Sequence, residues 1–156
     1  MMKSPSSGVL CFLIVSVLLG CSMPRIIILD DPLTADEHLT LGMAYDAKQE
    51  YDAAVREYES AAKKLNIAYL YLGNLHFKKG DMEKAEQYYK KAVKAGDDPP
   101  IADAYNNLAW LYYTKKEKLD EAELLAAKAI QLQPQSREHY EDTLMKIREL
   151  KKHLSH

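Results

Sequence analysis

Apolar residues recur at steps of three and four along most of this chain, which is the spacing that places them on one face of an α-helix. Three segments show this pattern and align when the chain is compared with itself. They read HLTLGMAYDAKQEYDAAVREYESA from His38, YLYLGNLHFKKGDMEKAEQYYKKA from Tyr69, and YNNLAWLYYTKKEKLDEAELLAAKA from Tyr105. Each contains two helical stretches separated by polar turn residues, so each predicts a pair of antiparallel helices.

Residues with strong preferences for helix ends mark the boundaries. Thr34 to Glu37 reads as a capping box at the start of the first helix. Gly80 ends one helix and Asp81 can cap the next. Pro99-Pro100 breaks the chain between the second and third segments, because proline cannot continue a helix. After Pro134, the stretch SREHYEDTLMKIRELKKHL predicts one further helix.

The three segments also repeat small and aromatic side chains at fixed positions. Small residues allow a neighbouring helix to cross closely, and Tyr58 and Tyr89 are expected to fill the space between successive units. The spacing from Gly42 to Gly73 is 31 residues and from Gly73 to Ala109 it is 36 residues, which indicates stacked supersecondary units. The small positions are Gly42, Gly73 and Ala109, each directly after a leucine, and Ala54, Ala85 and Ala122.

This pattern resembles the tetratricopeptide repeat over residues 35–134, with Pro134 at the place of the family's closing proline. The resemblance implies an all-α fold, a right-handed α-solenoid of three helix pairs at about residues 35–65, 66–98 and 101–134. The third repeat departs from the pattern, with Ala126 where an aromatic residue is usual and one extra turn residue near Glu117.

The end of the chain resembles the first helix of a fourth repeat without its second helix. Leu144 and Met145 stand at the Leu-Gly positions of such a helix. Because a solenoid would otherwise expose apolar surface at its end, residues 135–156 are expected to form a capping helix and tail. The alternative interpretation is a basic interaction tail around Lys151 and Lys152.

The first helices of tetratricopeptide repeats line a concave face, and the resemblance places a groove for a protein or peptide partner there. Side-chain amides can bond a peptide backbone, and aromatic rings supply the area typical of binding hot spots. The predicted groove residues are Leu39, Met43, Leu70, Asn74, Phe77, Asn106, Asn107, Trp110 and Tyr113, and Asp36, Asp46, Lys78 and Thr114 share their face. The alternative for Trp110 is that it only packs against the last helix.

The N-terminus has a different composition. Val9–Leu19 is almost wholly apolar, but its residues would form a helix of only about 16 Å, short of the roughly 30 Å hydrocarbon core of a bilayer. The sequence LLGC, Leu18 to Cys21, resembles the lipobox of bacterial lipoproteins. The resemblance implies a cleaved lipoprotein signal peptide at residues 1–20, a lipid on the Cys21 thiol, and a lipid-anchored linker at residues 21–34.

Two alternatives remain for this end, a buried core helix and a disulfide between Cys11 and Cys21. In the lipoprotein interpretation the mature chain keeps no free thiol, which suits an oxidising compartment. Ser22 after the lipidated cysteine favours sorting to the outer membrane. The expected location is therefore the bacterial cell envelope, on the periplasmic face of the outer membrane.

The linker contains an apolar, β-rich run at Ile26–Leu29 that a simple spacer would not need. One interpretation is that it packs along the first repeat. The other is a strand or plug that meets a partner or this protein's own groove.

Charge and candidate chemistry narrow the function further. The 156 residues carry 21 basic and 23 acidic side chains. The chain therefore lacks the basic surplus that would indicate a nucleic-acid partner. The five histidines show no metal-ligand spacing and no Gly-rich phosphate loop is present. We therefore expect no metal, cofactor, small-molecule substrate or enzymatic activity. His38 and His76 occupy repeat-framework positions and are expected to be structural.

These features predict an envelope-anchored scaffold that binds a protein or peptide in its groove and supports assembly of an envelope complex, such as a pilus, secretion or outer-membrane machinery. The alternative is an accessory or regulatory subunit of an envelope peptidase or cell-wall hydrolase. Similar short tetratricopeptide segments occur beside secreted cysteine peptidases in some bacterial lipoproteins.

Overall fold

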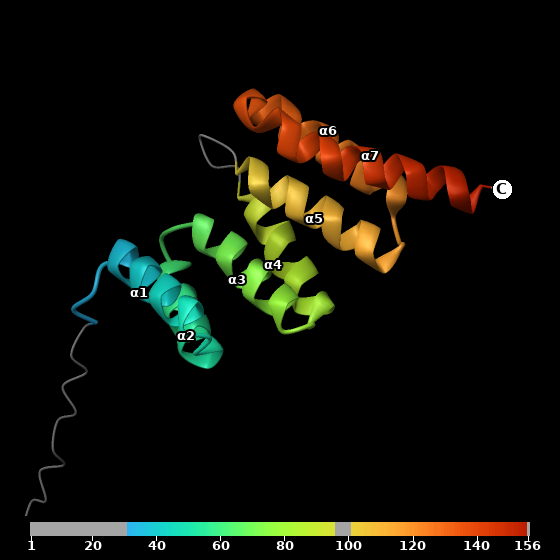
Figure 1. Ribbon diagram of the computed structural model, residues 1–156. Helices are drawn as coiled ribbons and strands as arrows, with labels where there is room; N and C mark the ends of the chain where they lie inside the picture. Colours follow the sequence, from blue (N-terminus) through green and yellow to red (C-terminus); the bar gives the residue numbers. More distant parts are fainter. Residues whose placement is uncertain (1–30, 96–100, 156) are drawn as a thin grey trace, which may run out of the picture. The chain divides into compact units, whose positions relative to one another are not determined.

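The computed structural model describes residues 31–95 and 101–155, and their regular structure is entirely helical (Figure 1). The elements are α1 (Ala35–Ala47), α2 (Tyr51–Ala61), α3 (Ile67–Lys78), α4 (Met82–Lys94), α5 (Ala102–Lys115), α6 (Leu119–Leu132), the short 3-10 helix η1 (Pro134–Ser136) and α7 (Arg137–Leu154). The predicted all-α fold is therefore confirmed for these residues. The predictions for the signal peptide, Cys21, Ile26–Leu29 and Pro99-Pro100 fall outside them.

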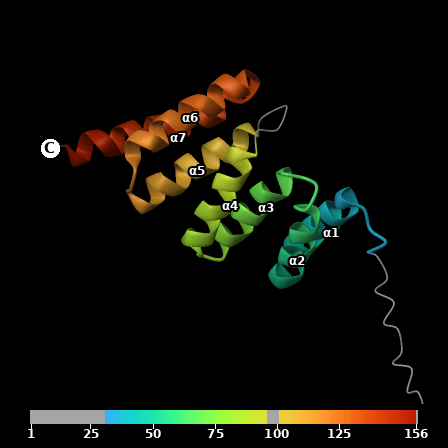
Figure 2. The ribbon, with the colours of Figure 1, turned by 180° about the vertical axis from the view of Figure 1, so that it is seen from behind.

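Helices that follow one another in the chain pack side by side. α1 packs with α2, α3 with α4 and α5 with α6, and the contacts α2–α3 and α4–α5 join these pairs. α7 lies along α6 and also touches α5, as the front and back views show (Figures 1 and 2). The three pairs coincide with the three predicted repeats. None of the helices described has both the length and the apolar character needed to span a bilayer.

The predicted helix caps are present. Thr34 Oγ1 accepts a hydrogen bond from the backbone N–H of Glu37 at 3.2 Å, and Glu37 Oε2 accepts one from the backbone N–H of Thr34 at 2.7 Å. The backbone N–H and the hydroxyl of Thr34 both donate to Glu37 Oε2, and these two bonds lower the pKa of the Glu37 carboxyl group. Gly80 adopts a φ of +78°, and Asp81 Oδ1 accepts from the backbone N–H of Lys84 at 3.1 Å. The sequence therefore predicted the start of α1 and the α3–α4 turn correctly.

The turn inside the third pair differs from the prediction. The α5–α6 connection has three residues, as do the α1–α2 and α3–α4 connections. The extra residue expected near Glu117 instead lengthens α5 to 14 residues. Lys116 and Lys118 both adopt left-handed backbone angles, with φ of 55° and 48°. The turn therefore absorbs the longer helix through backbone conformation rather than through added length.

The predicted close crossing at the glycine positions is confirmed. A Cβ on Gly42 would lie 2.5 Å from Cδ1 of Tyr58, and a Cβ on Gly73 would meet the ring of Tyr89 in the same way. Each tyrosine thus packs flat over the glycine of its own helix pair. The ring of Tyr58 also stacks on Tyr71 of the next pair, with centroids 5.3 Å apart, so it joins two repeats as expected.

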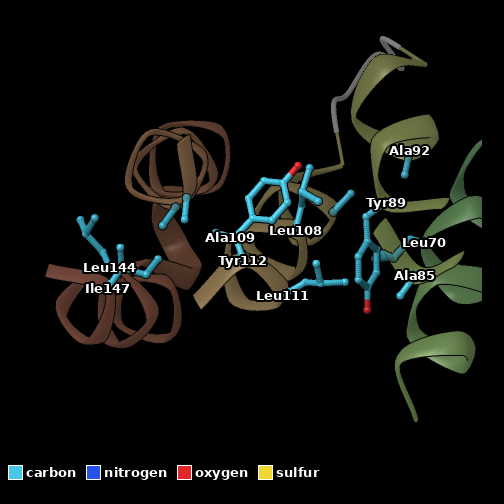
Figure 3. Close-up of a cluster of buried hydrophobic side chains, with 13 residues drawn as sticks. Leu70, Ala85, Tyr89, Ala92, Leu108, Ala109, Leu111, Tyr112, Leu144 and Ile147 are labelled. Carbon is cyan, nitrogen blue, oxygen red and sulfur yellow. The ribbon is translucent and has the colours of Figure 1, made fainter. Parts of the chain in front are cut away.

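Each first helix after α1 packs on the preceding pair through three positions with the same spacing. All are buried: Ala68, Leu72 and Leu75 in α3, Ala104, Leu108 and Leu111 in α5, and Tyr140, Leu144 and Ile147 in α7. In Figure 3, Leu108 and Leu111 lie between Tyr89 on one side and Leu144 and Ile147 on the other. α7 therefore packs as a first helix. Met145, at its glycine position, is 59% exposed because no described helix follows to cross it.

Candidate protein-interaction groove

Residues three and four positions apart on α3 and α5 share one face of each helix, and this spacing brings four predicted groove residues together. Asn74 and Phe77 from α3 and Asn107 and Trp110 from α5 line one hollow of about 430 Å³. We call this hollow the groove. Its remaining lining residues are Asp46 of α1, Tyr71 and Lys78 of α3, and Tyr89 of α4.

Two side-chain amides in the groove are held in a fixed arrangement. Asn74 Oδ1 accepts hydrogen bonds from the hydroxyl of Tyr89 at 2.9 Å and from Nδ2 of Asn107 at 2.8 Å. Burial raises the pKa of Tyr89, so its hydroxyl stays protonated and can donate. Both lone pairs of Asn74 Oδ1 are then used, whereas Asn74 Nδ2 and Asn107 Oδ1 have no partner among residues 31–95 and 101–155. The amide pair offers one donor and one acceptor to a ligand.

Charged groups stand at one side of the groove. Nζ of Lys78 lies 3.0 and 2.8 Å from the two carboxylate oxygens of Asp46 and ties α3 to α1. Because this lysine is about half exposed, the pair adds little stability and stays open to a ligand. The pair therefore gives this side of the groove a balanced charge.

Trp110, on α5, belongs to an aromatic pair that borders the groove. Trp110 packs against Tyr113 with centroids 5.0 Å apart, and Nζ of Lys146 in α7 lies 5.2 Å from the centre of the indole ring. Trp110 thus contacts the last helix and also lines the groove. Its packing against that helix is confirmed, and its part in binding a partner stays a prediction.

Leu70 and Asn106 are not groove residues, and the prediction for them is corrected. Leu70 is 6% exposed and belongs to the core cluster that contains Leu108, and Asn106 is 4% exposed. Each stands one position before a residue that lines the groove, Tyr71 and Asn107. A shift of one position turns a helical side chain by about 100°, which moves these two from the groove to the interior.

The other three predicted residues lie near the repeats' surface but outside the groove lining. Leu39 is half-buried against the cluster around Tyr58, and Tyr113 is half-buried against the core cluster that contains Leu108. Met43 is exposed. They therefore do not contribute to the hollow, although all three stand on first helices.

The sequence reasoning missed Tyr71 and Tyr89 as groove residues. Tyr71 directly precedes Leu72, as Asn107 directly precedes Leu108, so the repeat alignment itself contained this signal. The repeat pattern predicts only a packing role for Tyr89, but its hydroxyl reaches the groove and holds Asn74. A large ring that packs over glycine can still present its polar tip.

The two framework histidines have structural partners. Nδ1 of His38 lies 2.7 Å from Glu57 Oε2, and its Nε2 lies 3.0 Å from Asp31 Oδ2. His76 is buried and stacks on Tyr88 with centroids 5.3 Å apart. Burial lowers the pKa of His76, which favours the neutral ring. In the part of the chain that the structure describes, no three His, Cys, Asp or Glu side chains gather as a metal site.

A second hollow of about 430 Å³ lies on α1. Its lining residues are Leu33, Asp36, Glu37, Thr40, Leu41 and Ala44. Glu37, Leu41 and Ala44 correspond to the positions through which α3 buries Ala68, Leu72 and Leu75. This hollow is therefore the stacking face of the first repeat, which has no preceding pair within residues 31–155.

Comparison with known proteins agrees with this architecture. Two family models described as tetratricopeptide repeat match the chain, one over residues 64–135 and one over residues 38–63. The chain is also 35% identical over 101 residues to the Photosystem I assembly protein Ycf3 of Rippkaea orientalis. That match covers 56% of this chain and 57% of the relative, so the chain spans little more than half of the relative's length.

Proposed function

This chain carries tetratricopeptide repeats, and on that premise we propose that it is a scaffold that holds a protein or peptide segment in its groove. Repeats of this family serve protein–protein contacts. The matched relative is by name an assembly protein, which supports a role of the same general kind, in bringing the parts of a complex together.

The observation that carries the proposal is the amide pair. Asn74 Nδ2 can donate to a backbone carbonyl, and Asn107 Oδ1 can accept from a backbone N–H. Reversing both amides exchanges donor and acceptor between the two residues but still leaves one of each. A peptide group needs one acceptor and one donor, so the pair matches an extended segment regardless of its side chains.

The rest of the groove supplies area and charge. Phe77, Trp110 and Tyr71 present rings around a hollow large enough for one or two side chains of a partner. The Asp46–Lys78 pair adds both signs of charge without a net excess. This composition favours a protein segment with an apolar side chain flanked by polar groups.

We also propose that the scaffold acts at the bacterial cell envelope, tethered through a lipid on Cys21, where it supports assembly of an envelope complex. The lipobox sequence LLGC supports this anchor. Two or more acyl chains are needed for stable attachment, which a lipoprotein modification would provide. Incorporation of labelled palmitate by the full chain, and its loss in Cys21→Ala, tests the anchor. No enzymatic activity is part of the proposal.

The groove is tested with peptides selected from a random library against the full chain. Asn74→Ala and Asn107→Ala should each weaken the best peptide about 5- to 20-fold in calorimetric titration, because each removes one hydrogen bond to its backbone. Gln131→Ala is the matched control, since it truncates an exposed amide on α6 outside the groove. Equal affinity of all four proteins would reject the groove as the binding site.

A further inference from the structure

The ammonium group of Lys146 occupies a distinct position at the Trp110 side of the groove. It lies 5.2 Å from the centre of the indole ring and 2.7 Å from Asp142 Oδ2. The ring of Tyr113 packs beside Trp110, tilted by 34°. Lys146 thus sits between an aromatic face and a carboxylate, the two kinds of group that recognise organic cations.

Other lysines also lie over rings, but none of those rings lines the groove. Lys91 lies over Tyr69 and Tyr88, and Lys118 lies over Tyr112. Among the residues that the structure describes, Trp110 is the aromatic residue that both carries a lysine in this way and lines the groove. A cation of a bound segment can therefore reach the same ring.

The helix repeat explains why Lys146 is placed there. Asn74, Trp110 and Lys146 follow one another at intervals of 36 residues and each stands two positions after a buried leucine. Because α7 packs as a first helix, its residue 146 continues the face formed by Asn74 and Trp110. The cap thus extends the groove by one helix.

The side chain of Lys146 is also able to move away from Trp110 and Asp142. Its side chain is 42% exposed and that of Asp142 is 63% exposed, so the pair is solvent-accessible. Hydrogen bonding to Asp142 raises the pKa of Lys146, which keeps it charged. Glu149 is a further exposed carboxylate on α7 close enough to act on this lysine.

We propose that Trp110, Tyr113 and Asp142 form a subsite for a lysine or arginine side chain of the bound segment, and that Lys146 fills it when the groove is empty. The inference rests on the proposed function, since it names one feature of the segment that the groove holds. Arginine fits better than lysine, because its planar guanidinium can stack on the indole and bond both carboxylate oxygens. Lys146 is then an internal competitor that lowers affinity for weak ligands.

Trp110 is the single tryptophan of the chain and lines both the subsite and the groove, so its fluorescence reports binding at either, and the comparison of the two peptides isolates the subsite. The full chain and Lys146→Met are titrated with acetyl-Gly-Arg-Gly-amide and with its neutral citrulline counterpart. Lys146→Met should bind the arginine peptide about 3- to 10-fold more tightly than the wild type does. Lys146→Met should also bind the arginine peptide about 10-fold more tightly than the citrulline peptide. Adding Asp142→Asn should remove that preference.

Equal binding of the arginine and citrulline peptides to Lys146→Met would overturn the subsite and leave the groove proposal intact, provided that Asn74→Ala still weakens the library peptide. If neither tripeptide changes Trp110 fluorescence and no library peptide depends on Asn74, both proposals fail. Thermal unfolding of Lys146→Met at the wild-type temperature shows that the comparison is made on folded protein.

Discussion

At the residue scale, the third helix pair replaces the glycine–tyrosine contact of the other pairs with two alanines. Gly73 and Tyr89 correspond to Ala109 and Ala126, and both alanines are fully buried. In the second pair a small residue faces a large ring, whereas in the third pair two residues of equal size face each other. The sequence identifies Ala126 as a departure from the repeat pattern, but the contact between glycine and tyrosine within one pair is seen only in the structure.

Gly73→Ala should lower the free energy of unfolding by about 1–3 kcal/mol, because the added Cβ overlaps the ring of Tyr89. In a Tyr89→Ala background the same substitution should raise it by roughly 0.5–1 kcal/mol, since alanine is the better helix former. Urea denaturation of the four proteins measures this reversal of sign. An identical effect in both backgrounds would contradict the contact.

Tyr58 offers a second prediction. Its hydroxyl is buried with no hydrogen-bond partner among the described residues, whereas Asn74 supplies one to Tyr89. Met43 stands where Asn74 stands, directly after the glycine. Met43→Asn should therefore raise the free energy of unfolding by about 1 kcal/mol. Met43→Leu, which brings no amide, is the control, and urea denaturation compares the two variants. Equal stability of the two variants would contradict a hydrogen bond from an amide at position 43 to the Tyr58 hydroxyl.

At the element scale, helix ends could be predicted wherever the sequence holds a specific cap, as at Thr34 and Gly80. The α5–α6 turn could not, because lysine rarely adopts the left-handed backbone that Lys116 and Lys118 show. Counting positions along a helix also could not predict which residues border the groove. Leu70 and Asn106 are on first helices as expected, but a neighbouring helix covers them. Which residues remain open depends on packing between elements rather than on the pattern within one.

Gly80 tests the turn between α3 and α4. Apart from Gly80 and its two chain neighbours, no residue has an atom within 4 Å of a Cβ built there, so a substitution acts through the backbone. Gly80→Ala should lower the free energy of unfolding by about 1 kcal/mol, because φ is +78°. Gly80→Asn should cost less, since asparagine tolerates this region better. A smaller loss of stability for Gly80→Ala than for Gly80→Asn in thermal unfolding would contradict the left-handed backbone at this position.

At the scale of the whole molecule, Glu86 links the second helix pair to the third. Its carboxylate accepts from the hydroxyl of Tyr112 at 3.1 Å and lies 2.7 Å from Nζ of Lys118 and 2.8 Å from Nζ of Lys90. Burial opposes its charge, but hydrogen bonds from these groups outweigh burial and lower its pKa to about 2. A single carboxylate thus holds residues from α4, α5 and the turn before α6.

Glu86 predicts how stability depends on pH. Its pKa is lower in the folded chain than the ordinary 4.5, so its contribution is fully present above pH 4.5 and is lost as the pH falls through about 2. The stability difference between wild type and Glu86→Gln should be on the order of 1–3 kcal/mol near neutral pH and should shrink on acidification.

Urea titrations at several pH values measure this difference. Glu83→Gln is the control, because the Glu83 side chain is largely exposed and its Oε1 lies 4.0 Å from Nζ of Lys115. A difference for Glu86→Gln that stays constant between neutral pH and pH 2 would contradict the link.

The groove itself was predicted in part. Asn74, Phe77, Asn107 and Trp110 followed from repeat positions, because first helices present the same face in each unit. The hydrogen bonds that orient the amides and the contribution of α7 required the packed structure, since both join residues distant in sequence.

Photo-crosslinking in growing cells tests the central claim, that the groove holds a protein segment. A photoreactive phenylalanine analogue replaces Phe77, inside the groove, or Leu124, an exposed leucine on α6 outside it. We expect one discrete adduct from position 77, lost when Asn74→Ala is added, and none from position 124. An adduct from position 124 with none from position 77 would contradict it.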